Sequence, residues 1–268
     1  MTIETFQQTI IAYYRDHKRP MPWRDCDDPY KVLVSEIMLQ QTQVPRVLIK
    51  YPEFISQFPT FESLANASLK EVIATWQGMG YNRRAKYLKL IAEQIISEYG
   101  GKLPDNPIIL DSLPGIGPGT AGSLAVFAYN KPAVFIETNI RRVFIHFFFQ
   151  DQEDIDDKQI YPLVEQSLSG QDPRQWYYAL MDYGTMLGVT TENANKKSKH
   201  YSVQSKFEGS DRQIRGAILK ALVKESKMNE ESIIKAVEND ATRTRDILSR
   251  MEKEGMIVRD SNQFHLPE

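Results

Sequence analysis

Apolar residues recur at helical spacing along most of the first 187 residues, and this pattern restricts the chain to a mainly helical fold. Residues 3–17 alternate apolar and polar positions with the period of a helix. Further helices are expected at about residues 28–41, 44–58, 69–77 and 83–99. Before residue 190 no stretch shows the strict alternation of a convincing strand. We therefore predict an all-helical domain over residues 1–187.

The composition changes at about Gly188, where the helical pattern stops. Residues 188–208 are polar, which predicts a connector. Within it, residues 195–206 are basic, which fits a DNA contact or a solvated linker equally well. Three amphipathic helices and a terminal hairpin follow, which predicts a winged-helix domain over residues 209–268. Because its acidic and basic residues balance, the sequence favours neither DNA contact nor a packing or protein-contact role for this domain. Three arginines of its third helix could face DNA, namely Arg243, Arg245 and Arg250.

Cysteine usage and net charge exclude several classes of protein. A single cysteine, Cys26, cannot form an internal disulfide or hold a cysteine-ligated cluster or zinc finger. No apolar run approaches the roughly 20 residues of a membrane helix, and the acidic, amphipathic start is unlike a secretory signal. We therefore expect a cytoplasmic protein, associated with the nucleoid in a bacterium or archaeon, or a nuclear one in a eukaryote. A net charge of −2 means that only a local basic face could bind nucleic acid.

A glycine-rich segment, LPGIGPGTAG at residues 113–122, lies between two expected helices. Gly115 and Gly117 permit backbone conformations closed to other residues and leave the amides of the turn uncovered. Those amides and the positive end of the next helix can bind a phosphate oxygen. This predicts a helix-hairpin-helix motif that binds the DNA backbone. A simple glycine-rich turn between packed helices is the alternative. The candidate contacts are Leu113, Gly115, Ile116, Gly117, Gly119 and Thr120.

Glu36 lies in DPYKVLVSEIMLQQTQV, residues 28–44, and on a helix its neighbours one turn away include Val32, Leu33 and Leu39. Apolar surroundings disfavour a charged carboxylate, so Glu36 could hold a proton near neutral pH and act as a general acid. Taken alone, a surface glutamate or a buried salt bridge explains the residue better.

Two more segments carry candidate functional residues. In WQGMGYNRRAKYLK, residues 76–89, a tight turn presents Tyr81 ahead of Arg83 and other cations, as suits an aromatic that inserts between bases. A solvated basic helix start is the alternative. In VFIETNIRRVF, residues 134–144, Thr138 can cap a helix beginning at Asn139. Glu137 then stands at the helix entrance, either as a partner of the dipole or as an anion facing a cationic sugar.

Together these segments resemble the helix-hairpin-helix DNA glycosylase superfamily, and specifically the MutY-type adenine DNA glycosylases, over about residues 5–187. SEIMLQQTQV is the specific element, and motif order and separations agree throughout. Further support comes from PWR at 22–24, WQGMGY, LPGIGPGTAG and ALMDYG at 179–184. The resemblance implies a mainly α fold, with a two-lobed helix-hairpin-helix domain followed by the small winged-helix domain. It also implies monofunctional hydrolysis of the bond between a flipped base and its sugar, in double-stranded DNA that contains a mismatch.

The resemblance assigns roles to individual residues. Glu36 would protonate a ring nitrogen of adenine mispaired with 8-oxoguanine or guanine, and Glu137 with Asn139 would stabilise the cationic sugar. The residues that line the base pocket would be Trp23 and Arg24. The residues that contact DNA around the gap left by flipping would be Gln41, Thr42, Tyr81 and Arg83. A monovalent cation could be held by the hairpin carbonyls of Leu113 and Ile116.

The sequence departs from the family in three places. Glu137 stands where the family has aspartate; one methylene moves the charge by about an ångström, which can cost about 100-fold in rate. Gly119 replaces the lysine of lyase-active relatives, so Schiff-base chemistry has no nucleophile there. The four residues that stand near the expected cluster positions cannot serve as its cysteine ligands, namely Gly188, Asn195, Ser198 and Gln204. We therefore expect no iron–sulfur cluster and no other cofactor.

Two alternatives remain open at this point. The changes at positions 119 and 137 reshape the pocket, so a mismatch thymine or uracil glycosylase on the same scaffold is a close rival. A non-catalytic protein that binds mismatches or abasic sites is the rival from another class. The larger carboxy-terminal domain that reads 8-oxoguanine in many members has no counterpart here, which leaves the oxidised-base preference open. In each case we expect a monomer that acts away from membranes.

Overall fold

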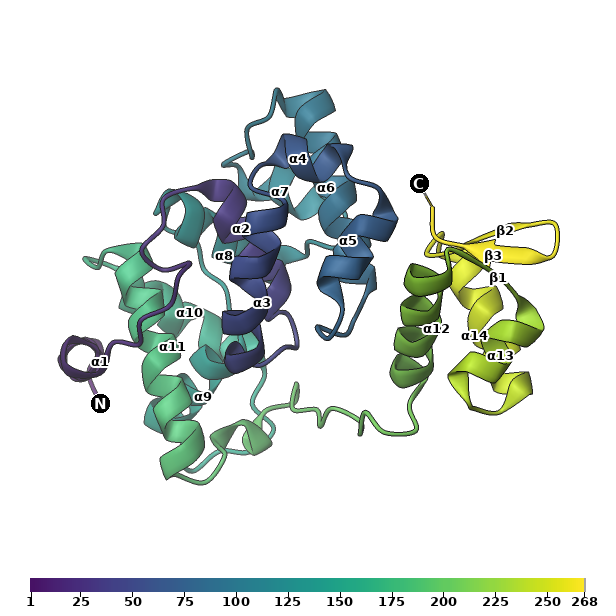
Figure 1. The fold of residues 1–268 in the computed structure, drawn as a ribbon. Coiled ribbons are helices and arrows are strands. Elements are labelled where there is room, and N and C mark those ends of the chain that lie inside the picture. Colours follow the sequence, from purple (N-terminus) through teal and green to yellow (C-terminus); the bar gives the residue numbers. More distant parts are fainter. Residues whose placement is uncertain (268) are drawn as a thin grey trace. The chain divides into compact units, whose positions relative to one another are not determined.

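The computed structural model describes residues 1–267 and divides them into two compact units (Figure 1). Unit 1 comprises Met1–Leu33 and Pro104–Val203, and unit 2 comprises Val34–Leu103 and Gln204–Glu268. Because each unit joins stretches that are distant in the chain, the predicted domain boundaries at residues 187 and 208 stay predictions. The predicted mainly α class is confirmed.

Unit 1 consists of helices, and helix α2 (Pro29–Leu39) continues from it into unit 2. Its other elements are α1 (Ile3–His17), α7 (Pro107–Ser112), α8 (Pro118–Tyr129), α9 (Thr138–Phe148), α10 (Asp157–Leu168), α11 (Pro173–Thr190) and the 3₁₀ helix η1 (Ala194–Lys197). The core lies where α1, α9 and α11 meet. There Phe6, Phe144 and Trp176 are fully buried, and the rings of Phe6 and Trp176 meet edge to face with centroids 5.8 Å apart. This core holds the amino end of α9 against α11.

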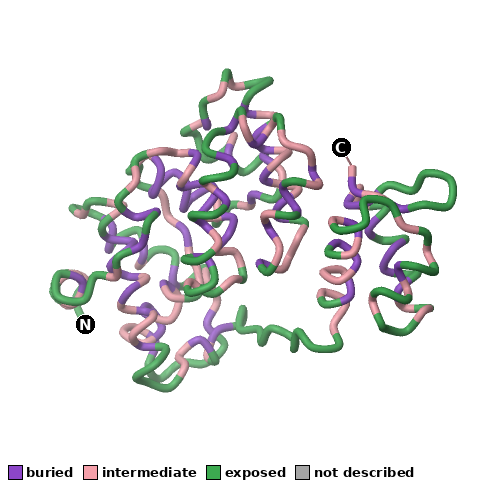
Figure 2. Tube along the Cα trace, viewed as in Figure 1, coloured by how far each residue is buried: buried purple, intermediate pink, exposed green. Residues whose placement is uncertain are grey.

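Unit 2 combines a helical part with the carboxy-terminal segment. The helical part contains α3 (Val44–Gln57), α4 (Phe61–Asn66), α5 (Leu69–Trp76) and α6 (Arg83–Tyr99). Capping boxes at Thr60 and Ser68 begin α4 and α5, and Gly100 ends α6 in the left-handed conformation. Phe54 and Trp76 meet edge to face in the core, with ring centroids 5.7 Å apart. Figure 2 shows the buried residues along the inward faces of the helices.

The carboxy-terminal segment contains three helices and a small sheet. Its elements are α12 (Asp211–Glu225), β1 (Lys227–Asn229), α13 (Glu230–Val237), α14 (Ala241–Lys253), β2 (Val258–Asp260) and β3 (Gln263–His265). The predicted helices and terminal hairpin are present, and β1 adds a third strand to an antiparallel sheet of order β1-β3-β2. Ser261, with a φ of 56°, forms the hairpin turn. The winged-helix assignment itself stays a prediction.

The predicted connector is partly ordered. Helix α11 continues to Thr190, and η1 follows at Ala194–Lys197. Asn195 and Ser198 are buried, and Ser198 forms a parallel bridge with Ile155. The first part of the predicted connector therefore packs against unit 1. Residues 201–209 are exposed throughout, as expected of a linker.

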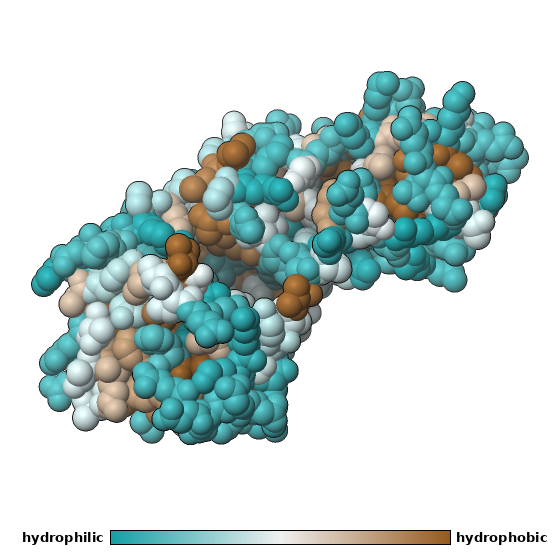
Figure 3. Space-filling view, turned by 90° about the horizontal axis from the view of Figure 1, so that it is seen from below, coloured by the Kyte–Doolittle hydropathy of each residue, from teal (hydrophilic) through white to brown (hydrophobic). Residues whose placement is uncertain are grey.

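The surface offers no large apolar patch on the face that Figure 3 draws, where small hydrophobic areas interrupt a largely hydrophilic surface. Among the described residues 1–267, no helix is long and apolar enough to cross a membrane.

Candidate active site

The carboxylate of Glu137 caps the amino end of α9. Its Oε1 accepts hydrogen bonds from the backbone amides of Asn139 (2.8 Å) and Ile140 (2.9 Å), and its Oε2 accepts one from Asn139 Nδ2 (3.3 Å). The sequence predicted that Thr138 would cap this helix, and that prediction was wrong. Thr138 is the first helical residue instead, because one oxygen of the Glu137 carboxylate, Oε1, accepts from two of the unpaired amides at the helix start.

Asn139 connects Glu137 to α11 through an arginine. Its Oδ1 accepts from Arg142 Nη1 at 2.9 Å, and the same nitrogen donates to the carbonyl of Gly184 on α11 at 2.7 Å. Asn195 Nδ2 donates to the carbonyl of Thr138 at 3.0 Å, which ties η1 to the same helix end. Three side chains, those of Asn139, Arg142 and Asn195, thus connect the Glu137 end of α9 to α11 and η1 through the carbonyls of Gly184 and Thr138.

Two glycines let α9 and α11 approach closely. A Cβ on Gly184 would lie 2.5 Å from the carbonyl oxygen of Asn139 and 2.7 Å from its Cβ. A Cβ on Gly188 would lie 2.7 Å from Arg142 Nη1. Both distances are below van der Waals contact; at Gly184 the neighbour is backbone, so only glycine permits the packing there, whereas at Gly188 the Arg142 side chain would have to move. The ALMDYG motif therefore ends in a residue whose lack of a side chain positions Asn139.

Burial raises the pKa of Glu137, and the amides of Asn139 and Ile140 together with Arg142 and Arg141 oppose that rise. The carboxylate is thus held in a poorly hydrated place while helix amides and a cation favour its charged form. A carboxylate in such surroundings is suited to stabilising a positive charge that develops beside it.

Glu36 lies on α2, three residues before the helix ends at Leu39, and is half-buried. Its helix is buried on most sides, since Val32, Leu33, Ile37 and Met38 are each at most 1% exposed. The predicted apolar setting of Glu36 is therefore present. Its role as a general acid stays a prediction.

Arg24 and Trp23, the predicted pocket residues, are both buried in unit 1. Arg24 donates to both oxygens of Asp182 at 2.8 Å, and its guanidinium lies 4.5 Å from the centre of the Tyr178 ring. Asp182 is the aspartate of the ALMDYG motif, and it also accepts from Arg19 Nε and the Arg19 amide. Sequence reasoning missed this pairing because nothing local links residues 24 and 182. The base-pocket role of Trp23 and Arg24 stays a prediction.

The glycine-rich hairpin joins α7 to α8. Leu113 and Ile116 are buried and anchor it, whereas Gly115, with a φ of 73°, and Gly119 are exposed. Gly117 has a φ of −116°, which any residue adopts, so the predicted need for an unusual conformation holds for Gly115 but was wrong for Gly117. An added Cβ at Gly117 or Gly119 would meet nothing within 4 Å. The start of α8, which includes Thr120, thus presents a bare backbone surface.

The tight turn before α6 presents Tyr81 with a φ of 47°. In the structure its hydroxyl accepts hydrogen bonds from Arg212 Nη1 (2.6 Å) and from Gln204 Nε2, both of the carboxy-terminal segment. Glu254 of the same segment pairs with Arg83 at 3.2 Å. The predicted DNA-contact residues of this turn therefore contact protein groups here. Gln41 and Thr42 follow the end of α2, and Gln41 is exposed with a φ of 54°.

The arginines predicted on the third helix of the carboxy-terminal segment are engaged within that segment. Arg243 and Arg250 both pair with Asp211 at 2.7 Å, and Arg245 pairs with Glu230 at the same distance. These pairs favour a packing role for α14 over contact with phosphates.

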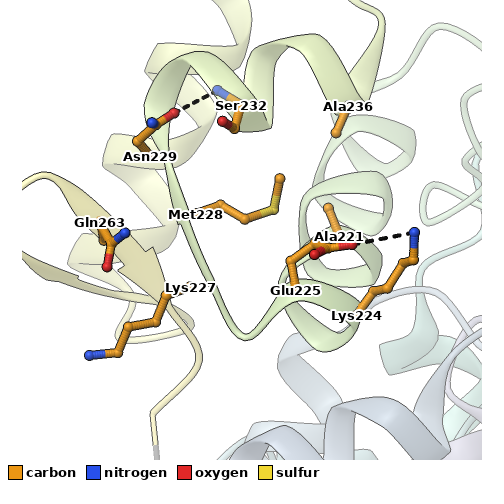
Figure 4. A pocket seen from close by; sticks show the side chains of 9 residues that line it. All are labelled: Ala221, Lys224, Glu225, Lys227, Met228, Asn229, Ser232, Ala236 and Gln263. Carbon is orange, nitrogen blue, oxygen red and sulfur yellow. Dashed lines mark hydrogen bonds and ion pairs between the residues drawn. The ribbon is translucent and has the colours of Figure 1, made fainter.

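A shallow hollow of about 410 Å³ lies between α12, β1, α13 and β3 (Figure 4). Met228 lies in it, and the Lys224–Glu225 ion pair lies at one side. None of the predicted site residues lines this hollow.

Comparison with known proteins identifies the family. The model of the HhH-GPD superfamily of base excision DNA repair proteins matches residues 34–168, about half of the chain. The protein belongs to this superfamily. The matched range includes the second half of α2 with Glu36, the hairpin and the Glu137 cap.

Individual relatives refine this result. The chain is 33% identical over 192 residues to an adenine DNA glycosylase of Buchnera aphidicola, and the match covers 70% of this chain and 54% of the relative. It is 29% identical over 187 residues to a thymine/uracil-DNA glycosylase of Methanothermobacter thermautotrophicus, covering 69% of this chain and 85% of the relative. A solved thermostable thymine-DNA glycosylase superposes with a TM-score of 0.65 at 27% identity, over 73% of this chain and 91% of the other. The chain thus spans about half the length of the adenine-specific relative.

Proposed function

We propose that the protein is a monofunctional DNA glycosylase that removes adenine mispaired with 8-oxoguanine or guanine. The observation that carries the proposal is the Glu137 carboxylate, which two backbone amides of α9 hold in a half-buried place. The superfamily membership supports base excision, and the identity to an adenine DNA glycosylase supports adenine as the base.

The proposed reaction uses each acid once. A flipped adenine receives a proton on a ring nitrogen from Glu36, which turns the base into a better leaving group. The bond between the base nitrogen and C1′ of the sugar then breaks, and Glu137 stabilises the oxocarbenium ion that forms. Water adds to C1′ and releases one proton to solvent, from which Glu36 regains the proton it donated; free adenine and an abasic site remain. Asn139 orients the Glu137 carboxylate.

DNA would be held by groups around this chemistry. The hairpin would bind a phosphate through the backbone at Leu113, Gly115, Ile116, Gly117, Gly119 and Thr120. Gln41, Thr42 and Tyr81 would occupy the gap in the duplex, and Arg83 would contact its backbone. Trp23 and Arg24 would line the base pocket. We further propose that the protein works as a monomer without an iron–sulfur cluster.

The test is single-turnover base release from duplexes with adenine opposite 8-oxoguanine, guanine or cytosine, with excess enzyme. Glu36→Gln and Glu137→Gln should each lower release by at least about 100-fold, the order of loss for removing one catalytic group. Glu53→Gln is the matched control, because Glu53 is exposed on α3 and forms a surface ion pair with Lys50 at 2.7 Å. Release that is unchanged in Glu36→Gln refutes the mechanism, and binding to mismatches without any release favours the non-catalytic binder.

A thymine or uracil glycosylase is the second candidate. The observation that favours it is the fuller coverage of the thymine/uracil-specific relative, 85% of its length against 54% for the adenine-specific one. Duplexes with thymine or uracil opposite guanine, run beside the adenine substrates, separate the two. Faster release of a pyrimidine than of adenine assigns the protein to this second class.

A further inference from the structure

Arg84 is a buried cation at the end of α2. Arg84 belongs to α6, and the residue is only 7% exposed. Nη1 donates to the carbonyl oxygens of Ile37 at 2.9 Å, Met38 at 2.8 Å and Gln40 at 2.6 Å. These carbonyls lie in and just after the last turn of α2, where no following helical amide can bond them. The guanidinium supplies both the missing donors and a positive charge at the negative end of the helix dipole.

The same guanidinium also holds the turn before α6. Nη2 donates to the carbonyls of Met79 (3.3 Å) and Gly80 (3.2 Å), and Nε donates to the carbonyl of Tyr81 (3.4 Å). Nη2 further donates to Thr42 Oγ1 at 2.9 Å. One planar group therefore bonds the backbone on both sides, after α2 and before α6.

The two segments that it joins contain unusual backbone. Gln41 and Tyr81 are not glycines, yet their φ values are 54° and 47°. Such conformations are strained for residues with a side chain and persist only where the surroundings fix them. The ring of Tyr81 lies with its centre 5.5 Å from the Arg84 guanidinium carbon, so the side chain as well as the backbone contacts the cation.

We propose that Arg84 is a positioning residue that holds Gln41 and Tyr81 together as a single wedge for the gap left by a flipped base. The inference rests on the proposed function, because it gives those two residues their task. The guanidinium of arginine suits this task better than the ammonium of lysine. Its planar group donates hydrogen bonds in several fixed directions, whereas the ammonium is a compact charge without a fixed plane of donors. Arg84 does not touch the reacting atoms.

The experiment compares Arg84→Lys with the wild type in the full chain. Base release in single turnover is measured together with the fluorescence of 2-aminopurine placed beside the target base, which rises on unstacking. We expect Arg84→Lys to lower release and the fluorescence change about tenfold, the effect of about 1.4 kcal/mol, and to change binding to a duplex with an abasic site less than threefold. Arg15→Lys, an exposed arginine of α1, is the control and should match the wild type.

A second background separates positioning from a purely structural role. In a chain that already carries Gln41→Ala and Tyr81→Ala, the wedge is absent, so Arg84→Lys should lower release less than twofold further. An equal tenfold loss in that background, or wild-type fluorescence in Arg84→Lys, overturns the proposal. Failure of the proposed function has a different signature. If the protein is no glycosylase, the wild type releases no base from any duplex, and the fluorescence comparison between wild type and Arg84→Lys still tests the wedge.

Discussion

Replacing Gly184 with alanine tests whether the close approach of α9 and α11 sets the active site. The new Cβ would lie 2.5 Å from the Asn139 carbonyl oxygen, whereas ordinary contacts begin at about 3.4 Å. The helices must therefore separate by up to about 0.9 Å, the difference between these distances. Overpacking of this kind costs about 1–3 kcal/mol, which lowers the melting temperature by about 2–12 °C in a chain of this size.

The displacement should reduce activity more than stability alone explains. Asn139 and the Glu137 cap move with the start of α9, and a shift of about 1 Å near the chemistry costs about 100-fold in rate. Single-turnover base release is measured below the melting transition, and the rate is expressed per folded molecule. The control is Gly216→Ala on α12, where a Cβ meets nothing within 4 Å and helix propensity predicts a gain of about 0.5–1 kcal/mol. A Gly184→Ala protein that melts lower but releases base at the wild-type rate refutes the reasoning.

Three further predictions follow from buried or engaged charges. Because burial raises the pKa of Glu137, ionising this carboxyl lowers the stability of the folded protein as the pH rises above its unfolded pKa. The Glu137→Gln protein should therefore have a melting temperature no lower than that of the wild type at neutral pH, and any difference in melting temperature should vanish in acid. Burial alone would raise the pKa of Asp182, but Arg24 and Arg19 hold it below its ordinary value. The stability that the ionised Asp182 contributes is therefore present above the pKa of an unfolded aspartate, about 4, and is lost as the pH falls through the pKa of Asp182 in the folded protein. Asp182→Asn should lower the free energy of unfolding in urea by about 3–5 kcal/mol at pH 7 and by less in acid. Finally, Arg212→Ala removes a donor from the Tyr81 hydroxyl, so mismatch binding by fluorescence anisotropy should tighten severalfold; weaker binding would instead assign Arg212 to the DNA contact.

The helices could be predicted well from local pattern. The helix expected at 83–99 is α6 at Arg83–Tyr99, because amphipathic spacing and Gly100 mark its course and end. Helix α4, Phe61–Asn66, was not predicted, since six residues are too few to show a helical period. Strand β1 is shorter still, and its pairing with β3 depends on a partner 36 residues away, the separation between Met228 and Phe264.

The candidate site was predicted in its residue types more than in its geometry. Glu36, Glu137 and Asn139 were identified from their segments, and the structure describes all three on or beside the expected helices. The cap of α9 was assigned to Thr138 because threonine is a preferred cap residue and glutamate is not. Only the folded backbone shows that the longer Glu137 side chain turns back to bond two amides.

The sequence by itself determined where the helices lie and which acids stand at the ends or faces of those helices. That information is local, because helical period and capping arise from residues three or four positions apart. Tertiary structure decided that Gly184 lets Asn139 approach α11, that Arg24 pairs with Asp182, and that Arg84 bonds two separate turns. Those contacts join residues distant in the chain, and their partners are chosen by the packing of whole helices, which no single segment encodes.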